Sequence, residues 1–360
     1  MKSQKPARQL EEWITAQATG KTRTLTPLPT TRTLGEQFQT SHGTAFRVLC
    51  RLEKQGVVWR HANGRFFPAW ARRALERPKP LAVMLRRMTS WSVLCREVME
   101  GFADACGERD HSLLLVHNKN LVDESGPGDA ITVASPSQQT DLLKDFLLLH
   151  GDTCGGVLFD ELWSDQAIRQ VLPPTIPAVV FHRPTEGEAI GSVAADFRAG
   201  ARLALGHLLA CEYRTLYFIE PFAGYPPSRI FLRAAREVFR ELSGRDFPMA
   251  RQIAWHHAAN RQAFLRKLAT SKTRCGLICP EDNTSQQICE ALRTTGIPLG
   301  PRHGLVSVMG TSAIPPEHLT CVRYDFRQMG RLAGQMLSNG KPETVLVSPR
   351  LETGSSTSAP

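Results

Sequence analysis

The sequence lacks the patterns that mark membrane proteins, exported proteins and several large enzyme classes. It contains no apolar run of about 18 residues, so we expect no transmembrane helix. The first residues, MKSQKPARQLEEW, are not followed by an apolar segment, which predicts no signal peptide and a cytoplasmic protein. A P-loop, a GxSxG elbow and an HExxH motif are also missing. We therefore expect neither an enzyme nor a cofactor.

Cysteine is present, but without the spacing of a metal site or a disulfide framework. The nine cysteines are scattered, and no CxxC pair occurs. Cys275 and Cys279 are close enough in sequence to share a metal ion, but no second pair of ligands lies nearby. The sequence predicts free thiols, mostly in strands, and no metal site.

The positive charge is confined to one end of the chain. Residues 1–79 hold 15 Lys and Arg against 5 Asp and Glu, whereas the rest of the 360 residues hold 29 of each. A need for solubility alone would not concentrate the charge in this way. A basic excess within one small domain indicates a nucleic-acid binder. The length suggests two or three domains.

The stretch Leu28–Pro68 has the pattern of two helices, a turn and a hairpin. Ala45, Val48, Leu49 and Leu52 are spaced to share one helical face, with basic residues on the opposite face. Asn63-Gly64 joins two short apolar runs, a strong signal for a type I′ hairpin turn with positive φ at both residues. Such a helix-turn-helix with a basic hairpin can place a helix in the major groove of DNA.

Helix boundaries in this region are also predicted by local signals. A first amphipathic helix is expected over residues 7–19. Thr30 can cap the next helix, and Ser41 can cap the one that would enter the groove. The segment 69–79 is predicted to be a basic linker, in which Pro78 and Pro80 oppose any helix.

LPTTRTLGEQFQTSHGTAFRVLCRLEKQG resembles the GntR family of bacterial winged-helix repressors, whose usual wording is LPSERELA…VSRxTVRRAL..L..EG. The match covers residues 7–68 and implies a DNA-contacting arginine at Arg32 and a wing-tip glycine at Gly64. His42 stands where the family has arginine, and imidazole cannot make the bidentate contact that arginine makes to guanine. Arg47 is a candidate to compensate, although a solvated helix face explains Arg47 and Arg51 equally well. The residues expected to contact DNA are Arg32, Ser41, His42, Gly43, Thr44, Arg47, Arg51, Arg60, His61, Asn63, Gly64 and Arg65.

From Leu81 onward, short apolar runs alternate with helical stretches. LAVML, CGGVLFDE, IPAVVFH, RTLYFIEP, RCGLICPE and GLVSVMG read as buried strands, with helices between them, for example over residues 142–150 and 165–171. This alternation predicts parallel sheets in βαβ units, enough for two doubly wound lobes. Ligands of such sheets bind at the carboxyl ends of the strands, which here means between the lobes.

This part of the chain resembles the effector domain of the LacI/GalR repressors, which shares its fold with periplasmic sugar-binding proteins. The resemblance rests on IGSVAADFRAGARLALGHLLACEYRTLYFI, RCGLICPEDNTSQQICEALRTTGIPLG, GLVSVMGTS and LTCVRYDFRQMGRLAGQML. The fold class expected for the whole chain is a winged helix-turn-helix (α+β) joined to a two-lobed α/β periplasmic-binding-protein-like domain with parallel sheets. The expected domains are 1–68 for DNA binding, 69–79 as linker, 80–350 for the effector and dimerisation, and 351–360 as a disordered tail.

The resemblance implies a small-molecule effector, in most relatives a sugar or nucleobase, held by polar groups at strand ends. The family's usual acidic residue after GLVSV is replaced at Met309 or Gly310, and the register of the ligand arginine between Arg229 and Arg233 stays open. Trp91 could stack on a sugar ring or simply pack on the sheet, and Asp196 fits a helix cap better than a ligand contact. The residues expected to bind the effector are Trp91, His182, Arg229, Arg233, Glu281 and Asp282.

The sequence therefore predicts a transcriptional regulator, in the first instance a repressor, that binds an operator in double-stranded DNA as a homodimer. A small-molecule effector between the lobes would switch its affinity for DNA. The alternative is a DNA-bound regulator whose lobes no longer sense an effector and serve only in dimerisation.

Overall fold

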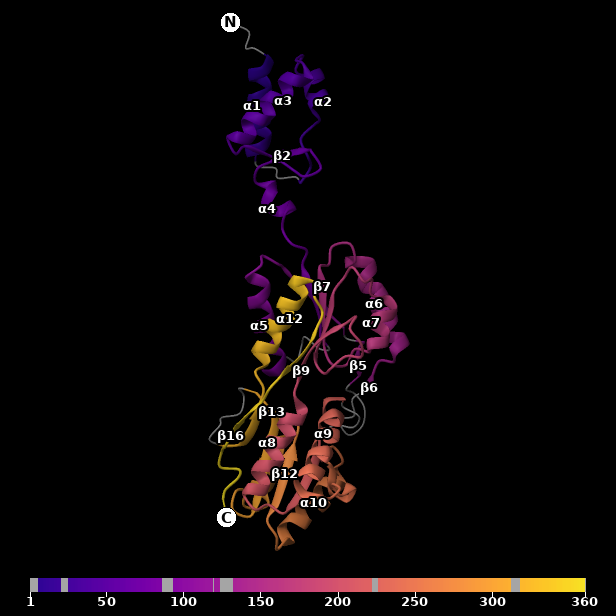
Figure 1. The fold of residues 1–360 in the computed structure, drawn as a ribbon, viewed down its shortest axis with the longest axis vertical. Helices are drawn as coiled ribbons and strands as arrows, with labels where there is room; N and C mark the ends of the chain where they lie inside the picture. The colour runs from indigo at the N-terminus through magenta and orange to yellow at the C-terminus, as the bar shows by residue number, and fades with distance from the viewer. Residues whose placement is uncertain are drawn as a thin grey trace. The chain divides into compact units, whose positions relative to one another are not determined.

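The computed structural model of the chain describes residues 6–20, 25–85, 93–118, 120–123, 132–221, 226–311 and 318–359 (Figure 1). The chain divides into two units, Met1–Pro78 and Lys79–Pro360, each with a hydrophobic core of its own. None of the helices in the described ranges combines the length and apolar character needed to cross a bilayer.

The described part of the first unit has three helices, a two-stranded hairpin and a short fourth helix. Its core contains the fully buried Leu10, Ile14 and Leu34. The predicted inner face of the third helix is confirmed, because Ala45, Val48, Leu49 and Leu52 are all buried. The elements are α1 (Pro6–Thr19), α2 (Thr31–Gln37), α3 (His42–Lys54), β1 (Val58–Arg60), β2 (Phe66–Pro68) and α4 (Ala71–Leu75).

The two predicted caps are present. The Thr30 hydroxyl accepts a hydrogen bond from the Thr33 backbone N–H at 3.2 Å, at the start of α2. The Ser41 hydroxyl accepts one from the Thr44 N–H at 3.1 Å, at the start of α3. Each cap satisfies a donor that the first turn of a helix leaves without an intrahelical partner.

The hairpin turn differs from the type I′ turn expected at Asn63-Gly64. Within the hairpin only Gly64 has a positive φ, of 83°. Its N–H donates to the His61 carbonyl at 2.8 Å, so Ala62 and Asn63 are the central residues of the turn. This is the pattern of a longer hairpin loop, in which an ordinary turn is followed by one left-handed glycine. The Asn63 side chain accepts a bond from the Arg65 N–H at 3.1 Å and supports the loop.

The segment expected to be a linker without a helix contains α4. The helix ends at Leu75, before Pro78 could interrupt it. Arg72 holds it to the hairpin, because its guanidinium lies 5.8 Å from the ring centroid of Trp59. Arg72 also pairs with Glu76 at 2.8 Å, across one helical turn.

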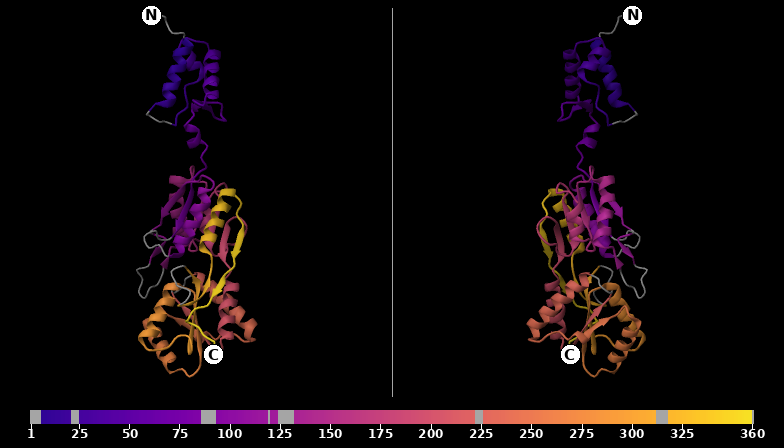
Figure 2. Two further views of the ribbon diagram at one scale, coloured as in Figure 1. Left: turned by 90° about the vertical axis from the view of Figure 1, so that its left-hand side faces the viewer. Right: turned by 90° about the vertical axis from the view of Figure 1, so that its right-hand side faces the viewer.

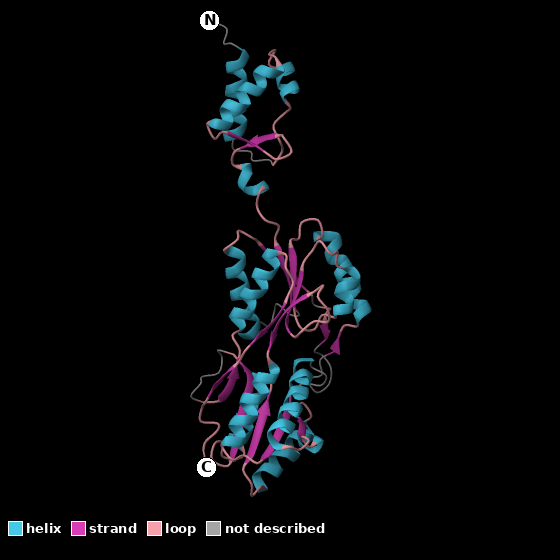
Figure 3. Ribbon diagram, viewed as in Figure 1, coloured by secondary structure: helices cyan, strands magenta, loops and turns pink. Residues whose placement is uncertain are grey.

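The second unit has two lobes, each built on a six-stranded sheet with helices on its faces (Figures 1 and 3). Lobe I has the strand order β15-β9-β8-β7-β3-β4, and lobe II the order β11-β10-β12-β13-β14-β16. Within these two six-stranded sheets, every described pairing is parallel except β14 with β16. The prediction of two lobes with parallel sheets is therefore confirmed.

The bounds of the elements follow the predicted alternation. Lobe I holds β3 (Leu81–Leu85), α5 (Val93–Gly107), β4 (Leu113–His117), α6 (Pro136–His150), β7 (Gly156–Phe159), α7 (Asp165–Val171), β8 (Ala178–His182), β9 (Gly191–Ala195), α12 (Phe326–Asn339) and β15 (Thr344–Val347), with a small ribbon of β5 (Val122–Asp123) and β6 (Thr132–Val133). Lobe II holds α8 (Phe197–Ala210), β10 (Thr215–Glu220), α9 (Pro226–Ser243), the 3-10 turn η1 (Met249–Arg251), β11 (Gln252–Ala254), α10 (Ala258–Thr270), β12 (Cys275–Cys279), α11 (Asp282–Thr294), β13 (His303–Gly310), β14 (Thr320–Arg323) and β16 (Arg350–Glu352).

The chain crosses between the lobes three times, after β9, after β14 and after β15. One hydrophobic core is continuous across these crossings, since it includes Phe181 and Val193 of lobe I and Phe218 and Val308 of lobe II. Figures 1 and 2 show the lobes end to end, with α5 and α12 side by side in lobe I. The ends of the strands at the junction are thereby brought together.

The C-terminal residues are packed, which corrects the disordered tail expected over residues 351–360. Leu351 and Glu352 belong to β16, and Ser356 and Thr357 are buried. The Ser356 hydroxyl donates to the Leu305 carbonyl at 2.7 Å and accepts from the Thr320 N–H at 2.8 Å. Ser356 thereby bonds the C-terminal segment to β13 and β14.

Candidate nucleic-acid interface and interlobe site

The first two turns of α3 present a polar and partly aromatic surface. His42, Phe46 and Arg47 are exposed there, on the side opposite the buried face of the helix. Ser41 and Thr44 are hydrogen-bonded to each other through their hydroxyls at 2.9 Å, and Arg47 donates to the Thr44 hydroxyl at 3.3 Å. The start of a helix is a suitable place for a phosphate.

Two of the predicted DNA-binding arginines have different surroundings. Arg32 lies on α2 with 87% of its side chain exposed, and pairs with Glu36 at 3.2 Å across one turn. Such an exposed pair is weak and leaves the guanidinium available to a ligand. Arg51 instead contacts Glu11 at 2.7 Å, which joins α3 to α1. Arg51 therefore has a structural partner, whereas Arg32 projects into solvent.

The hairpin carries the remaining predicted DNA contacts. Asn63, Gly64 and Arg65 are exposed at its tip, and His61 is half-buried beside Trp59 at a ring distance of 5.3 Å. Arg60 donates to the Gly64 carbonyl at 3.4 Å, so its side chain folds back along the hairpin. Its guanidinium also lies 5.6 Å from the ring centroid of Phe46 on α3. The hairpin and α3 thus form one continuous surface.

Phe46 is a residue of this surface that the sequence reasoning missed. The signal was present, since position 46 aligns with the first arginine of VRR in the family wording quoted above. The apolar pattern of α3 concealed it, because a phenylalanine in a helix next to Ala45 suggests a core position. In the structure 37% of Phe46 is exposed.

In the second unit, polar and sulfur-containing residues meet where strands of both lobes end. Glu161 follows β7, and His182 ends β8, both in lobe I. Met309 lies at the end of β13 in lobe II. The His182 Nε2 atom and the Met309 Sδ atom are 3.0 Å apart, and both residues are buried. The Glu161 Oε1 atom lies 4.0 Å from His182 Nδ1.

Aromatic rings surround this contact. The His182 ring lies 6.0 Å from that of Phe181 in a stacked arrangement, 5.7 Å from Phe197 and 5.9 Å from Phe326. Phe181, Phe197 and Phe326 are all buried. His182, proposed from sequence as a ligand contact, is therefore packed against the protein's own side chains from both lobes.

The two acidic residues predicted to bind the effector, Glu281 and Asp282, make hydrogen bonds at the start of α11. Glu281 caps the helix by accepting from the Asn283 and Thr284 N–H groups, at 2.9 and 2.5 Å. Asp282 accepts from the Ser307 hydroxyl at 2.9 Å and from both the N–H and the hydroxyl of Thr311 at 2.7 Å. Burial raises the pKa of Asp282 to about 6, and these hydrogen bonds oppose part of that rise. Asp282 thereby joins α11 to the end of β13.

The two arginines proposed for the ligand lie elsewhere. Arg229 and Arg233 are exposed on α9, whose inward side carries Ser228, Phe231 and Leu232. The structure does not bring either arginine to the His182–Met309 contact. Trp91, the remaining predicted effector residue, lies outside the described residues.

An arginine that the sequence reasoning did not select lies near the junction. Arg183 follows β8 and has only 14% of its side chain exposed. It donates to the Glu161 carbonyl at 3.0 Å and contacts Asp165 at 2.6 Å. The HRP run at the strand end was the available signal, because polar residues that directly follow buried strands gather at the junction.

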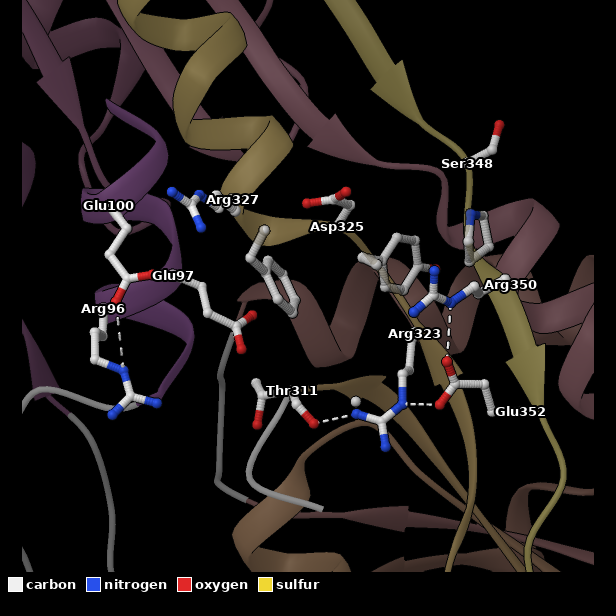
Figure 4. A pocket seen from close by; sticks show the side chains of 14 residues that line it. Arg96, Glu97, Glu100, Thr311, Arg323, Asp325, Arg327, Ser348, Arg350 and Glu352 are labelled. Carbon is white, nitrogen blue, oxygen red and sulfur yellow. Dashed lines mark hydrogen bonds and ion pairs between the residues drawn. The ribbon is translucent and has the colours of Figure 1, made fainter. Parts of the chain in front are cut away.

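A cavity of about 730 Å³ lies where the crossings meet, lined by residues of both lobes (Figure 4). Figure 4 shows Arg96, Glu97 and Glu100 of α5 along one wall, and Arg350 and Glu352 of β16 along another. Glu352 pairs with Arg350 at 2.9 Å and also with Arg323, which in turn donates to the Thr311 carbonyl. A molecule bound here would contact both lobes.

Most of the second lobe, together with α12 and β15 of the first, matches a known domain family. Residues 205–357 match the family model described as a periplasmic binding protein-like domain. A search of curated proteins gave no match. The family match includes the end of β13, Asp282 and two of the three crossings.

Solved structures extend the likeness to most of the chain. The transcription regulator CcpA of Lactococcus lactis is 15% identical, with a TM-score of 0.61 over 78% of this chain and 100% of that one. A LacI family transcriptional regulator from Enterococcus faecium with bound ribose is 16% identical, with a TM-score of 0.58 over 78% and 99%. The lac repressor dimer bound to operator and the anti-inducer ONPF is 16% identical, with a TM-score of 0.60 over 81% and 98%. The chain therefore contains the two-lobed, periplasmic-binding-protein-like fold that LacI-family repressors also have.

Proposed function

We propose that this protein is a sequence-specific, DNA-binding transcriptional repressor that acts as a homodimer. Residues 1–68 would be a GntR-type winged helix, with α3 in the major groove and the β1–β2 hairpin against the backbone or the minor groove. Two copies would read a pseudo-palindromic operator, because a two-fold dimer presents two identical readers.

One observation carries this proposal. Residues 1–79, which hold the chain's whole basic excess, also expose a capped helix start with Arg47 on α3, and Arg32 is exposed on α2. Basic charge supplies the sequence-independent attraction to phosphates, and an exposed helix face supplies the contacts to base edges.

We further propose that the second unit senses a small polar molecule, such as a sugar, at the junction of the lobes. Ribose is bound to the Enterococcus faecium regulator, and an anti-inducer to the lac repressor dimer. An effector could switch DNA binding here only through different affinities for the two arrangements of the lobes.

A second candidate function is a repressor whose lobes sense no effector and serve only in dimerisation. The contact between His182 and Met309 favours it, because the protein's own side chains occupy the centre of the junction. The exposed position of Arg229 and Arg233 favours it as well, since neither is placed to hold a ligand there.

Selection of bound sequences from random duplex DNA with the full-length protein tests the DNA half. We expect one enriched, approximately palindromic sequence. Its binding constant should fall steeply with salt, since each phosphate contact adds roughly 0.9 to the negative slope of the log–log plot. No enrichment, or binding that is flat in salt, would reject DNA as the partner.

A panel of sugars and nucleobases separates the two candidates for the lobes. A ligand that binds only the folded state increases the free energy of unfolding, by roughly 2.7 kcal/mol at a concentration a hundred times its Kd. The melting temperature rises as a result. An upward shift with one compound, together with a change in operator affinity, would support the sensor. No shift across the panel would favour the regulator without an effector.

A further inference from the structure

Phe46 stands out on α3 as a large apolar side chain outside the buried face of the helix. The helix buries Ala45, Val48, Leu49 and Leu52, and Phe46 lies outside that face with 37% of its surface exposed. In the described part of the first unit, Phe46 is not among the residues that form the core or pack against it. The ring does meet Phe66 of that core, but packing of the unit does not explain the part of Phe46 that is left in solvent.

The hairpin holds the Phe46 ring in one orientation. The Arg60 guanidinium lies 5.6 Å from its centroid, and the Phe66 ring meets it edge-on at 6.2 Å with an interplanar angle of 72°. Arg60 is itself bonded to the Gly64 carbonyl and lies 5.7 Å from the Phe66 centroid. A ring fixed before binding loses little conformational freedom when a partner covers its open side.

The neighbours of Phe46 indicate what that partner is. His42 lies one turn earlier on the same ridge of α3, and Arg47 is the next residue, so the ring is in the centre of the proposed DNA-reading surface. A phenyl ring can neither donate nor accept a hydrogen bond to a base edge. The 5-methyl group of thymine is the one apolar feature that a base pair presents in the major groove.

We propose that Phe46 is a specificity-determining residue that reads the 5-methyl group of a thymine in each half of the operator. This inference rests on the proposed function. Position 46 is arginine in the VRR wording of the related repressors, so an apolar side chain replaces a basic one here. Arg60, behind the ring, is then close enough to the duplex to neutralise a phosphate.

The experiment uses the full-length protein and the operator obtained by selection. Each thymine is replaced in turn by deoxyuridine, which removes only the methyl group. We expect one position in each half-site at which affinity falls roughly three- to tenfold per half-site, the size expected for one methyl group removed from an apolar contact. Replacing cytosine by 5-methylcytosine, in an operator with a C·G pair at that position, should restore part of the affinity.

The variants assign the effect to Phe46. Phe46→Ala should bind the thymine operator more weakly and show no further loss with deoxyuridine, whereas Phe46→Leu should keep part of the discrimination. The slope with salt should stay unchanged in both, because no phosphate contact is removed. Leu25→Ala is the matched control, since Leu25 is an exposed apolar residue of the same unit and should retain the full deoxyuridine penalty.

The outcomes separate the two proposals. A selected operator whose affinity is insensitive to deoxyuridine at every position, or an undiminished penalty in Phe46→Ala, would overturn the role of Phe46 and leave the DNA-binding function standing. Failure to enrich any sequence would reject both. Melting curves of the Phe46 variants check that a loss of binding is not a loss of folding.

Discussion

His182 and Met309 join the two lobes through an imidazole–thioether contact of 3.0 Å, and both residues have a positive φ, of 75° and 67°. Non-glycine residues seldom adopt this backbone conformation, because Cβ crowds the following carbonyl oxygen. Two such residues facing each other indicate that the surrounding core compensates for the strain. The contact therefore couples the backbone conformation at the ends of β8 and β13 to the way the two lobes are held together.

Met309→Ala should lower the free energy of unfolding by about 2–5 kcal/mol, as expected when a buried methionine is truncated. Met309→Gly should cost about 1 kcal/mol less than the alanine variant, since glycine adopts the positive φ without strain. Usually a glycine variant is less stable than the alanine variant at the same position. Urea unfolding of the full chain measures both, and Met249→Ala, at an exposed methionine, should change stability by less than about 0.5 kcal/mol.

A double-mutant cycle with His182→Ala isolates the contact itself. If this contact stabilises the junction of the lobes, the double variant should be more stable than the sum of the single losses predicts, by roughly 0.5–1.5 kcal/mol. Additivity of the two losses, or a glycine variant less stable than the alanine variant, would contradict this account of the junction.

Asp282 should make part of the stability depend on pH between about 4 and 6. Its pKa is about 6 in the folded protein and close to 3.8 when unfolded, so in this window only the folded state keeps the proton. The free energy of unfolding should therefore decrease as pH rises from 4 to 6, by on the order of 2–3 kcal/mol, and level off above. Below pH 4 both states are protonated, and the contribution is fully present.

Asp282→Asn should lack this decrease. The difference in unfolding free energy between wild type and variant should shrink as pH rises, because only the wild type loses stability through Asp282. Exposed carboxyl groups whose pKa is lowered by arginine partners, such as Asp104 and Glu290, act in the opposite sense, and they cancel in the comparison. A difference that stays constant from pH 4 to pH 7 would contradict the raised pKa.

Much of the fold could be predicted because its signals are local. Runs such as LAVML and AVVFH are buried on both faces, and a continuous apolar run is the direct consequence of that burial. The helix expected over residues 142–150 begins at Pro136, because the Ser135–Gln138 capping box carries a signal that apolar periodicity lacks. The ordered C-terminus could not be foreseen, because the hydrogen-bond partners of Ser356 lie on strands that are distant in sequence.

The sites were harder to predict than the fold, because a residue type does not reveal which way it points. His182, Glu281 and Asp282 were correctly placed at strand ends, yet their hydrogen bonds and ring contacts are to the protein itself. The side of α9 that faces the protein carries Phe231, and the arginines on either side of it are exposed. The rotation of the helix about its axis decides whether an arginine faces the junction or the solvent, and a single sequence does not determine that rotation.

Gly330 permits the close approach of α12 and α5. A Cβ placed there would lie 1.9 Å from the Val98 carbonyl oxygen, and one at Gly101 would lie 1.8 Å from the Arg327 carbonyl oxygen. Since backbone atoms cannot move aside cheaply, Gly330→Ala should cost at least about 3 kcal/mol in unfolding free energy. Gly107→Ala should be neutral or stabilise by up to about 1 kcal/mol, because a Cβ added at Gly107 would have open space around it. Equal melting temperatures for the two variants would argue against this packing.

Arg32 and Arg51 should differ in what they contribute. Arg32→Ala should weaken operator binding by roughly 1–3 kcal/mol with little change in melting temperature, because its side chain is exposed and its pair with Glu36 is weak. Arg51→Ala should lower stability by up to about 1 kcal/mol, since it loses the Glu11 contact between α1 and α3, and should affect binding less.

Binding titrations at one fixed salt concentration, with melting curves of the same samples, measure both effects. Glu36→Gln is the control for Arg32, because it releases the guanidinium without removing it. The affinity of the Glu36→Gln variant for the operator should equal or exceed that of the wild type. Unchanged affinity in Arg32→Ala would remove this residue from the interface. A larger loss of binding in Arg51→Ala would mean that Arg51 exchanges Glu11 for DNA, and that the α1–α3 ion pair is broken in the complex.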